Sequence, residues 1–299
     1  MLKYTNPQKR EAMNNIQLAH SPDADDIFMY FAIKFGWVNT KGLSFDNIGL
    51  DIETLNVEAL KGTYDVSAIS FGMYALIKDE YALLRTAVSF GEGYGPKLIK
   101  PKNKKLKRNF KVALSGKYTT NAMLFRIYYP LARPVYMDFL EIEQAVIDGK
   151  VDAGVLIHES ILDFDQSLEV EKELWDIWVE LAGKGLPLPL GGMAVRRSLP
   201  LNRAIDIENI LIDGVKVANE RKTELCEKLE ADKLVRISSD MLIKYLDMYA
   251  SDESVSLSPV QLKALDTLYA LGFEHGLWDC KMKTEDYLLP IEYEGLRGQ

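Results

Sequence analysis

The sequence predicts an α/β protein of two lobes with a central cleft and a helical carboxy-terminal segment. The 299 residues suit about two domains of ordinary size. Strand-like and helix-like segments alternate over most of the first 200 residues, which is typical of sheets covered by helices. Clusters of glycine and proline at 91–96 and 187–192 interrupt this alternation, and we interpret them as an outward and a return crossing between lobes. The predicted parts are a discontinuous first lobe, a second lobe and a polar amino-terminal extension: 16–92 plus 193–299, 93–192, and 1–15.

The first lobe begins with a strand at 15–20, the turn SPDADD at 21–26, and a buried helix that ends at Gly36. Alternating apolar residues then predict a strand at 48–55, and Asn56 is a suitable cap for a short helix at 56–62. The remaining segments of this lobe are a strand, a helix and a strand at 65–70, 71–80 and 81–90.

The second lobe repeats the pattern, with strands predicted at 111–114, 133–137 and 151–157 and helices at 121–129 and 140–149. The chain then becomes helical. One helix face is predicted along 207–229. A further helix over 258–272 has Ser258 as its cap, Pro259 at its first position and Gly272 just past its end.

Composition excludes several classes of function. Net charge is −8, from 36 basic and 44 acidic residues, which disfavours sequence-independent binding to nucleic acid. We interpret the single basic run, at 100–108, as a solvated loop. Apolar stretches are far shorter than the roughly 20 residues that cross a bilayer. The polar amino terminus lacks the apolar core of a secretory signal, so a cytoplasmic protein is expected. Cys226 and Cys280 are far apart, and no disulfide or metal site is expected.

Polar residues gather where predicted strands end. The buried strand VDAGVLI finishes on His158, whose imidazole titrates near neutrality and suits a general base. The loop SGKYTT places Ser115, Thr119 and Thr120 at a helix start, where N–H groups and hydroxyls suit a carboxylate or phosphate. Ser70 follows a third strand. In open α/β sheets ligands bind at the carboxyl ends of strands, so these side chains predict a shared cleft.

The turn SPDADD adds carboxylates to this cleft. One of Asp23 and Asp25 is expected to cap the following helix and the other to face the cleft, with Asp25 as the candidate substrate contact. His20, which precedes the turn, is expected to be structural. The residue spacing does not suggest a metal site.

The segments SPDADDIFMY, DVSAISFGMY, SGKYTT, GKVDAGVLIHES and GLPLPLGG, in this order and spacing, resemble the 1,4-dihydroxy-6-naphthoate synthases of the futalosine route to menaquinone. The resemblance spans roughly residues 16–200. It implies a type II periplasmic-binding-protein-like fold and a cytosolic lyase that cleaves a carbon–carbon bond of cyclic dehypoxanthinyl futalosine, an anionic substrate, without a cofactor. It also implies that His158 is the general base and that Ser70, Thr119 and Thr120 contact the ligand.

Two departures from the family pattern matter. Asp25 stands where members often have asparagine, which adds negative charge near an anionic substrate. Ala68 stands where others have lysine, which leaves the Thr119/Thr120 helix start as the better partner for the substrate carboxylate. The alternative functions are chorismate dehydratase of the same pathway and a non-catalytic solute-binding protein. The sequence predicts neither the oligomeric state nor the extent of lobe closure.

Overall fold

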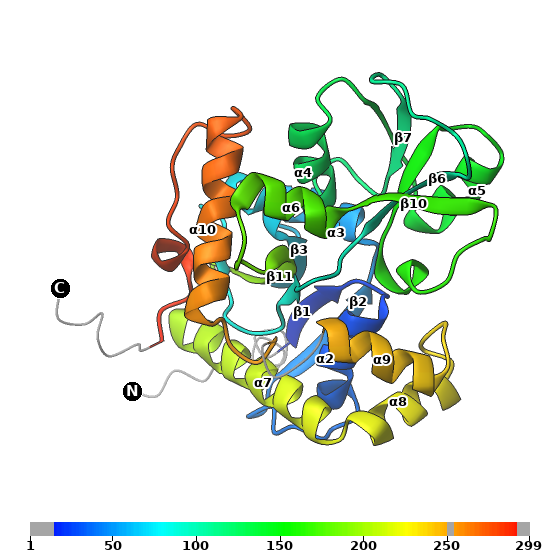
Figure 1. Ribbon diagram of the computed structural model, residues 1–299. Coiled ribbons are helices and arrows are strands. Elements are labelled where there is room, and N and C mark those ends of the chain that lie inside the picture. The colour runs from blue at the N-terminus through cyan, green and yellow to red at the C-terminus, as the bar shows by residue number, and fades with distance from the viewer. Residues whose placement is uncertain (1–14, 250–253, 292–299) are drawn as a thin grey trace, which may run out of the picture.

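Two mixed sheets, each flanked by helices, form the protein (Figure 1). The computed structural model describes residues 15–249 and 254–291. The predicted polar extension therefore lies outside the described residues, except for Asn15, which is the first residue of a strand.

The first sheet has the order β2-β1-β3-β11-β4, with β5 paired to β11. Strands β1, β2 and β3 are parallel, and β11 runs antiparallel to β3, β4 and β5. Helices α2 and α3 and the 3-10 helix η1 follow β1, β2 and β3 in turn. The bounds are β1 Asn15–His20, α2 Ala24–Lys34, β2 Ser44–Gly49, α3 Ile52–Leu60, β3 Val66–Ser70, η1 Phe71–Leu76, β4 Tyr81–Leu83, β5 Ser89–Gly91 and β11 Leu188–Arg196.

The segment between β1 and β3 differs from its prediction. Strand β2 begins at Ser44 instead of 48, and α3 begins at Ile52, inside the predicted strand. Asp51 is the cap of α3, because its carboxylate accepts hydrogen bonds from Glu53 N and Thr54 N. Asn56 is therefore not a cap but a fully buried residue inside the helix.

The second sheet has the order β10-β6-β9-β7-β8, in which β7 is parallel to β8 and β9. The cluster at 91–96, interpreted as the outward crossing, lies between β5 of the first sheet and β6 of the second. The return crossing comes before Leu188, because β11 already belongs to the first sheet from that residue and the predicted boundary at 192 falls inside it. The bounds are β6 Lys97–Pro101, β7 Lys111–Leu114, α4 Thr120–Tyr128, β8 Arg133–Tyr136, η2 Phe139–Glu141, α5 Ile142–Ile147, β9 Ala153–Leu156, η3 His158–Ile161, β10 Leu168–Glu173 and α6 Leu174–Ala182.

The carboxy-terminal segment is helical, as predicted, and covers the first lobe (Figure 1). The helix predicted over 207–229 is broken at Arg221, whose guanidinium binds Glu224 and stacks on Trp37. Helix α7 packs on α2, while α10 contacts both β11 of the first lobe and α6 of the second. The bounds are α7 Leu201–Glu220, α8 Lys222–Ala231, α9 Ser239–Tyr249, α10 Pro259–Glu274 and η5 Thr284–Tyr287.

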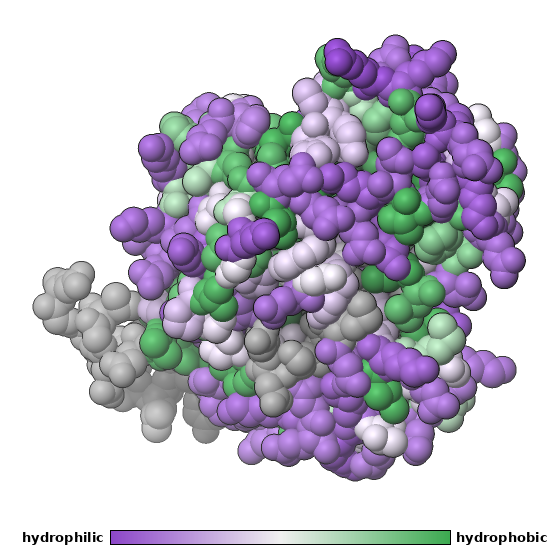
Figure 2. Space-filling view, viewed as in Figure 1, coloured by the Kyte–Doolittle hydropathy of each residue, from purple (hydrophilic) through white to green (hydrophobic). Residues whose placement is uncertain are grey.

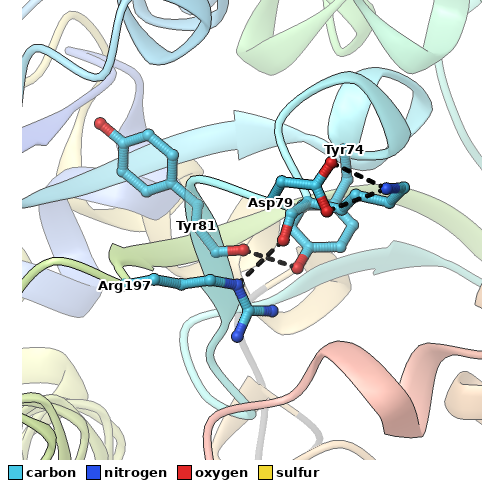
Figure 3. A network of polar contacts seen from close by, with 5 residues as sticks. Tyr74, Asp79, Tyr81 and Arg197 are labelled. Carbon is cyan, nitrogen blue, oxygen red and sulfur yellow. Dashed lines mark hydrogen bonds and ion pairs between the residues drawn. The ribbon is translucent and has the colours of Figure 1, made fainter.

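A network of polar contacts holds η1 against β4 and the end of β11 (Figure 3). The Tyr74 hydroxyl donates to Tyr81 O at 2.8 Å, and Arg197 Nε donates to Lys78 O at 2.9 Å. Burial raises the pKa of Tyr81 to about 12, so its phenol remains a neutral donor to Tyr64 O. The network anchors η1, which lies next to α4 of the second lobe.

The molecular surface seen in Figure 2 is mostly hydrophilic, and its apolar residues form small separate areas. The described residues on this face therefore form no broad apolar surface of the kind that marks a large interface. Among the described residues, no helix combines the length and the apolar character needed to span a bilayer.

The end of α10 differs from its prediction for a packing reason. Ser258 caps the helix in a capping box with Gln261, and Pro259 is the first residue, as expected. However, the helix continues to Glu274, so Gly272 lies inside it. A Cβ at Gly272 would lie 1.9 Å from Cζ2 of the Trp278 indole. The glycine is required by a packed ring and does not end the helix.

Gly272→Ala is expected to lower the free energy of unfolding by about 1–3 kcal/mol, because overpacking outweighs the gain in helix propensity. Urea denaturation measures the effect. Ala270→Gly, at an exposed position of the same helix, should cost only about 1 kcal/mol through propensity. A stabilised Gly272→Ala protein would contradict this account of the Trp278 contact.

Candidate active site

A cavity lies between the two sheets, with about 700 Å³ of empty space that includes its opening to solvent. Its walls come from the loops that follow β1, β3, β7 and β9, and in each lobe these strands are parallel neighbours. The carboxyl ends of all four strands therefore open on the same space. The structure brings Ser70, Ser115, Thr119, Thr120 and His158 to this one cavity.

His158 reaches the cavity through a sharp change of backbone direction. Strand β9 ends at Leu156, and His158 then adopts a left-handed conformation with φ 54° as the first residue of η3. For a non-glycine residue this conformation costs about 1–2 kcal/mol. It is compensated by contacts of the ring, since Nδ1 lies 2.8 Å from Asp23 Oδ2 of the other lobe and Phe139 packs edge-on at 4.9 Å.

Asp23 is the residue at the helix start whose role the sequence left open. It precedes α2 with an extended backbone, but its side chain makes no capping hydrogen bond and turns instead to His158. Burial by itself raises the pKa of this carboxyl. The charge and the hydrogen bond of His158, together with smaller effects of the Ser21 side chain and the Asp26 backbone, lower it more, so the pKa lies below the usual 3.8. Asp23 is therefore a carboxylate that orients an imidazole.

The polar residues of the loop before α4 and of the helix start have different roles. Thr119 caps the helix by accepting from Ala122 N at 3.1 Å. Thr120 connects the lobes, because its Oγ1 donates to Leu190 O at 2.6 Å and accepts from Gly72 N at 2.9 Å. Ser115 has a different position: its hydroxyl is buried in the cavity wall and has no hydrogen-bond partner among the described residues. An unmatched buried hydroxyl beside an empty space is suited to a ligand.

Ser70 is held in place by Asn56, the residue predicted to cap a helix. Asn56 Nδ2 donates to Ser70 Oγ at 3.0 Å, and Ser70 N donates to Asn56 Oδ1 at 2.9 Å. Both residues are buried. This reciprocal pair fixes the carboxyl end of β3 at the cavity.

Asp25 lies in the first turn of α2, and its side chain is outside the described part of the structure. Its predicted contact with substrate stays a prediction. His20 is buried and its Nδ1 lies 2.6 Å from Ser21 O, in agreement with a structural role. Among the described residues, no cluster of three or more histidine, cysteine, aspartate or glutamate side chains could hold a metal ion.

The residues of the cavity wall that were not predicted from the sequence include Asn121 and Tyr245. Asn121 follows the Thr119/Thr120 pair on α4, and the helix-start pattern that identified this pair could also have identified Asn121. Tyr245 comes from α9, more than 80 residues after His158, and is almost fully buried. No local pattern marks Tyr245, because only the packing of α9 on α2 and β5 brings it to the cleft.

Comparison with known proteins identifies the family of this chain. A family model described as menaquinone biosynthesis matches residues 16–274. The chain belongs to this family. A 1,4-dihydroxy-6-naphthoate synthase of Thermus thermophilus is 27% identical over 266 residues, which are 89% of this chain and 96% of that protein. One of Streptomyces coelicolor is 33% identical over 193 residues, 62% of this chain and 67% of that protein. This menaquinone-biosynthesis protein is an enzyme, a lyase, as the sequence motifs predicted.

Solved structures confirm the predicted fold. A crystal structure of an Archaeoglobus fulgidus protein has a TM-score of 0.82 and 35% identity, covering 89% of this chain and 99% of that one. A periplasmic aliphatic sulphonate-binding protein of Escherichia coli has a TM-score of 0.65 at 12% identity, covering 93% and 92%. At that identity the second similarity shows the fold alone, which is the two-lobed periplasmic-binding-protein fold.

Asp23→Asn tests the link between the carboxylate and stability. We expect a loss of about 1–3 kcal/mol in the free energy of unfolding at pH 7. Because the pKa of Asp23 is lower in the folded protein than its usual 3.8, the carboxylate stabilises the fold above that pH, and its contribution is lost as the pH falls through the folded-state pKa. Urea denaturation at several pH values should show the difference between wild type and variant shrinking as the pH falls below 3.8. A difference that does not change with pH would contradict this.

The control for that series is Asp79→Asn. Asp79 pairs with Lys78 on the surface and its side chain is 88% exposed. Its removal should change the unfolding free energy by less than about 1 kcal/mol at every pH.

Ser115→Ala separates ligand binding from folding. Because the Ser115 hydroxyl has no partner among the described residues, its removal should leave thermal stability unchanged or raise it. The same variant should bind substrate about 10-fold more weakly, since one hydrogen bond contributes about 1 kcal/mol. Calorimetry of unfolding and of binding measures the two effects. A clear loss of stability without a loss of affinity would assign Ser115 to the fold and not to the site.

Proposed function

We propose that this enzyme converts cyclic dehypoxanthinyl futalosine to 1,4-dihydroxy-6-naphthoate by carbon–carbon cleavage, with His158 as the general base. The observation that carries the proposal is the 2.8 Å contact between His158 Nδ1 and Asp23 Oδ2 at the wall of the cavity. A buried carboxylate that orients an imidazole also stabilises its protonated form. The two synthases to which the chain is similar support the choice of product, which their names state.

Proton abstraction is assigned to Nε2 of His158, because Nδ1 is engaged by Asp23. The proton leaves a carbon of the bound substrate for Nε2, and the electron pair that remains forms a double bond as the carbon–carbon bond to the sugar-derived fragment breaks. The fragment departs with the electron pair of the broken bond and takes up the proton held on Nε2. The bicyclic product then becomes aromatic, which supplies the driving force. Asp23 holds the imidazolium until the proton is passed on.

The anionic end of the substrate is proposed to bind at the start of α4. The first N–H groups of this helix, at positions 120 and 121, have no partner within a regular helix and carry the positive end of its dipole. Ser115 Oγ and the Asn121 side chain lie in the same wall. Ala68 contributes no cation here, so backbone donors and hydroxyls must supply the binding energy.

Closure of the cavity over the substrate excludes water. The wall combines apolar side chains such as Ile52, Ile157 and Leu190 with the polar groups above. A desolvated site strengthens each electrostatic contact and protects the carbanion-like transition state from solvent. The proposed compartment is the cytoplasm, in keeping with a biosynthetic enzyme that acts on a small anionic metabolite.

His158→Ala is expected to lower kcat by about 10³-fold, because a positioned general base contributes roughly 10²–10⁴-fold. The assay incubates purified protein with cyclic dehypoxanthinyl futalosine and follows the naphthoate by absorbance and mass. His275→Ala is the matched control, since His275 is an exposed histidine at the end of α10. Near-wild-type turnover by a folded His158→Ala protein would reject this role.

Two outcomes of the same assay would redirect the proposal. If the wild-type enzyme forms no naphthoate, chorismate becomes the next substrate to test. If neither substrate is converted, mass spectrometry of ligands retained by the purified protein tests the solute-binding alternative.

A further inference from the structure

Glu53 of the first lobe reaches across the cleft to the backbone of the second. It lies in the first turn of α3. Its Oε1 accepts a hydrogen bond from Lys117 N at 2.8 Å, and its Oε2 accepts one from Tyr118 N at 2.9 Å. One carboxylate therefore binds two consecutive N–H groups of the loop that leads into α4. Hydrogen bonds to an ionised acceptor are about twice as strong as neutral ones.

Gly116 makes this close approach possible. A Cβ at position 116 would lie 2.2 Å from Glu53 Oε2 and 2.6 Å from its Cδ. No other residue type fits at this position while the carboxylate stays where it is. Gly116 of SGKYTT thus leaves the space that Glu53 of the opposite lobe occupies. No local sequence pattern indicates this pairing, because the two residues are far apart in the chain.

The carboxylate is also partly removed from water. Burial raises the pKa of Glu53, although the N–H groups of Tyr118 and Lys117 act in the opposite direction. Placing a carboxylate in such a position costs free energy that its two hydrogen bonds must offset. An arrangement of this kind requires the two lobes to be together.

Both ends of this contact belong to the site. Ile52, next to Glu53, lines the cavity, and Asn56, one turn further along α3, holds Ser70. On the other side, the loop carries Ser115 and Thr119. Helix α3 therefore contacts both walls of the cavity. Asn56 fixes Ser70 in the wall of its own lobe, and Glu53 binds the loop that forms the wall of the other lobe.

We propose that Glu53 is a positioning residue that latches the loop at 116–118 to the first lobe and keeps the α4 start in place for the substrate anion. The latch raises the fraction of molecules in which the lobes are arranged for binding. The apparent dissociation constant is the intrinsic value divided by that fraction, so loss of the latch weakens binding. Substrate at saturation restores the closed arrangement, and the chemical step at His158 is then little changed. This kinetic consequence rests on the proposed function, whereas the latch itself does not.

The first test is hydrogen exchange of the Lys117 and Tyr118 amides in the ligand-free protein. Glu53→Ala should speed their exchange at least about 10-fold, because both donors lose their acceptor. Glu53→Gln keeps one acceptor oxygen and should have an intermediate effect. Glu58→Ala is the matched control: Glu58 lies on the same helix but bonds only to Lys61 and Thr63 of its own lobe. Unchanged exchange of both amides in Glu53→Ala would overturn the proposal.

The second test uses Gly116. Gly116→Ala should displace the carboxylate and reproduce the faster exchange of Glu53→Ala. Adding Gly116→Ala to Glu53→Ala should change little further, because the two substitutions remove one contact. Additive effects would show that Gly116 and Glu53 act independently and would reject the latch. These measurements need no substrate, so they remain decisive even if the proposed reaction fails.

The third test is kinetic. Glu53→Ala should raise KM by about 10-fold and leave kcat within about 2-fold, as expected for a lower fraction of competent molecules. A purely structural defect would lower activity without this division between KM and kcat. An unchanged KM, or a loss confined to kcat, would contradict the positioning role. Should Glu53→Ala fail to fold, Glu53→Gln and Gly116→Ala provide the same comparison.

Discussion

The contact between Asp23 and His158 is the interaction on which the site depends. It joins the loop after β1 in one lobe to the loop after β9 in the other, with Nδ1 and Oδ2 2.8 Å apart. The two residues are 135 positions apart in the chain, so each is positioned by a different sheet. Removing either partner would leave a buried polar group without compensation, which is costly in a region of low dielectric. The pair therefore requires the lobes to meet in one arrangement.

Other hydrogen bonds beside the cavity also join the two lobes. Thr120 bonds to Gly72 N and Leu190 O, and Glu53 bonds to the backbone at 117 and 118. Each uses a strong acceptor or donor at the edge of the cavity. A Cβ has no room at Gly72, which lies against the Thr120 backbone, or at Gly116, which lies against the Glu53 side chain. The lobes are thus joined by directional hydrogen bonds beside the cavity, while each sheet keeps its own apolar core.

A fold of this kind serves many binding proteins, and the family membership distinguishes this chain from them. The sulphonate-binding protein shares the architecture at 12% identity. The feature of this cleft that supports the proposed catalysis is the imidazole held by a buried carboxylate, since a binding protein has no use for a base with one nitrogen fixed in place. The function proposed here thus depends on the site more than on the fold.

The sequence by itself determined the α/β class and the loops that carry Ser70, Ser115, Thr119 and His158, because strand ends and helix caps are local patterns. The family resemblance was likewise readable from motifs and is confirmed. Only the tertiary structure decided that Asp23 orients His158 instead of capping α2, that Asn56 holds Ser70, and that Gly272 accommodates Trp278. Aspartate, asparagine and glycine each have a common local role that predicts a cap or a helix end. Their actual partners are distant in sequence, and the packing of two lobes is what brings them into contact.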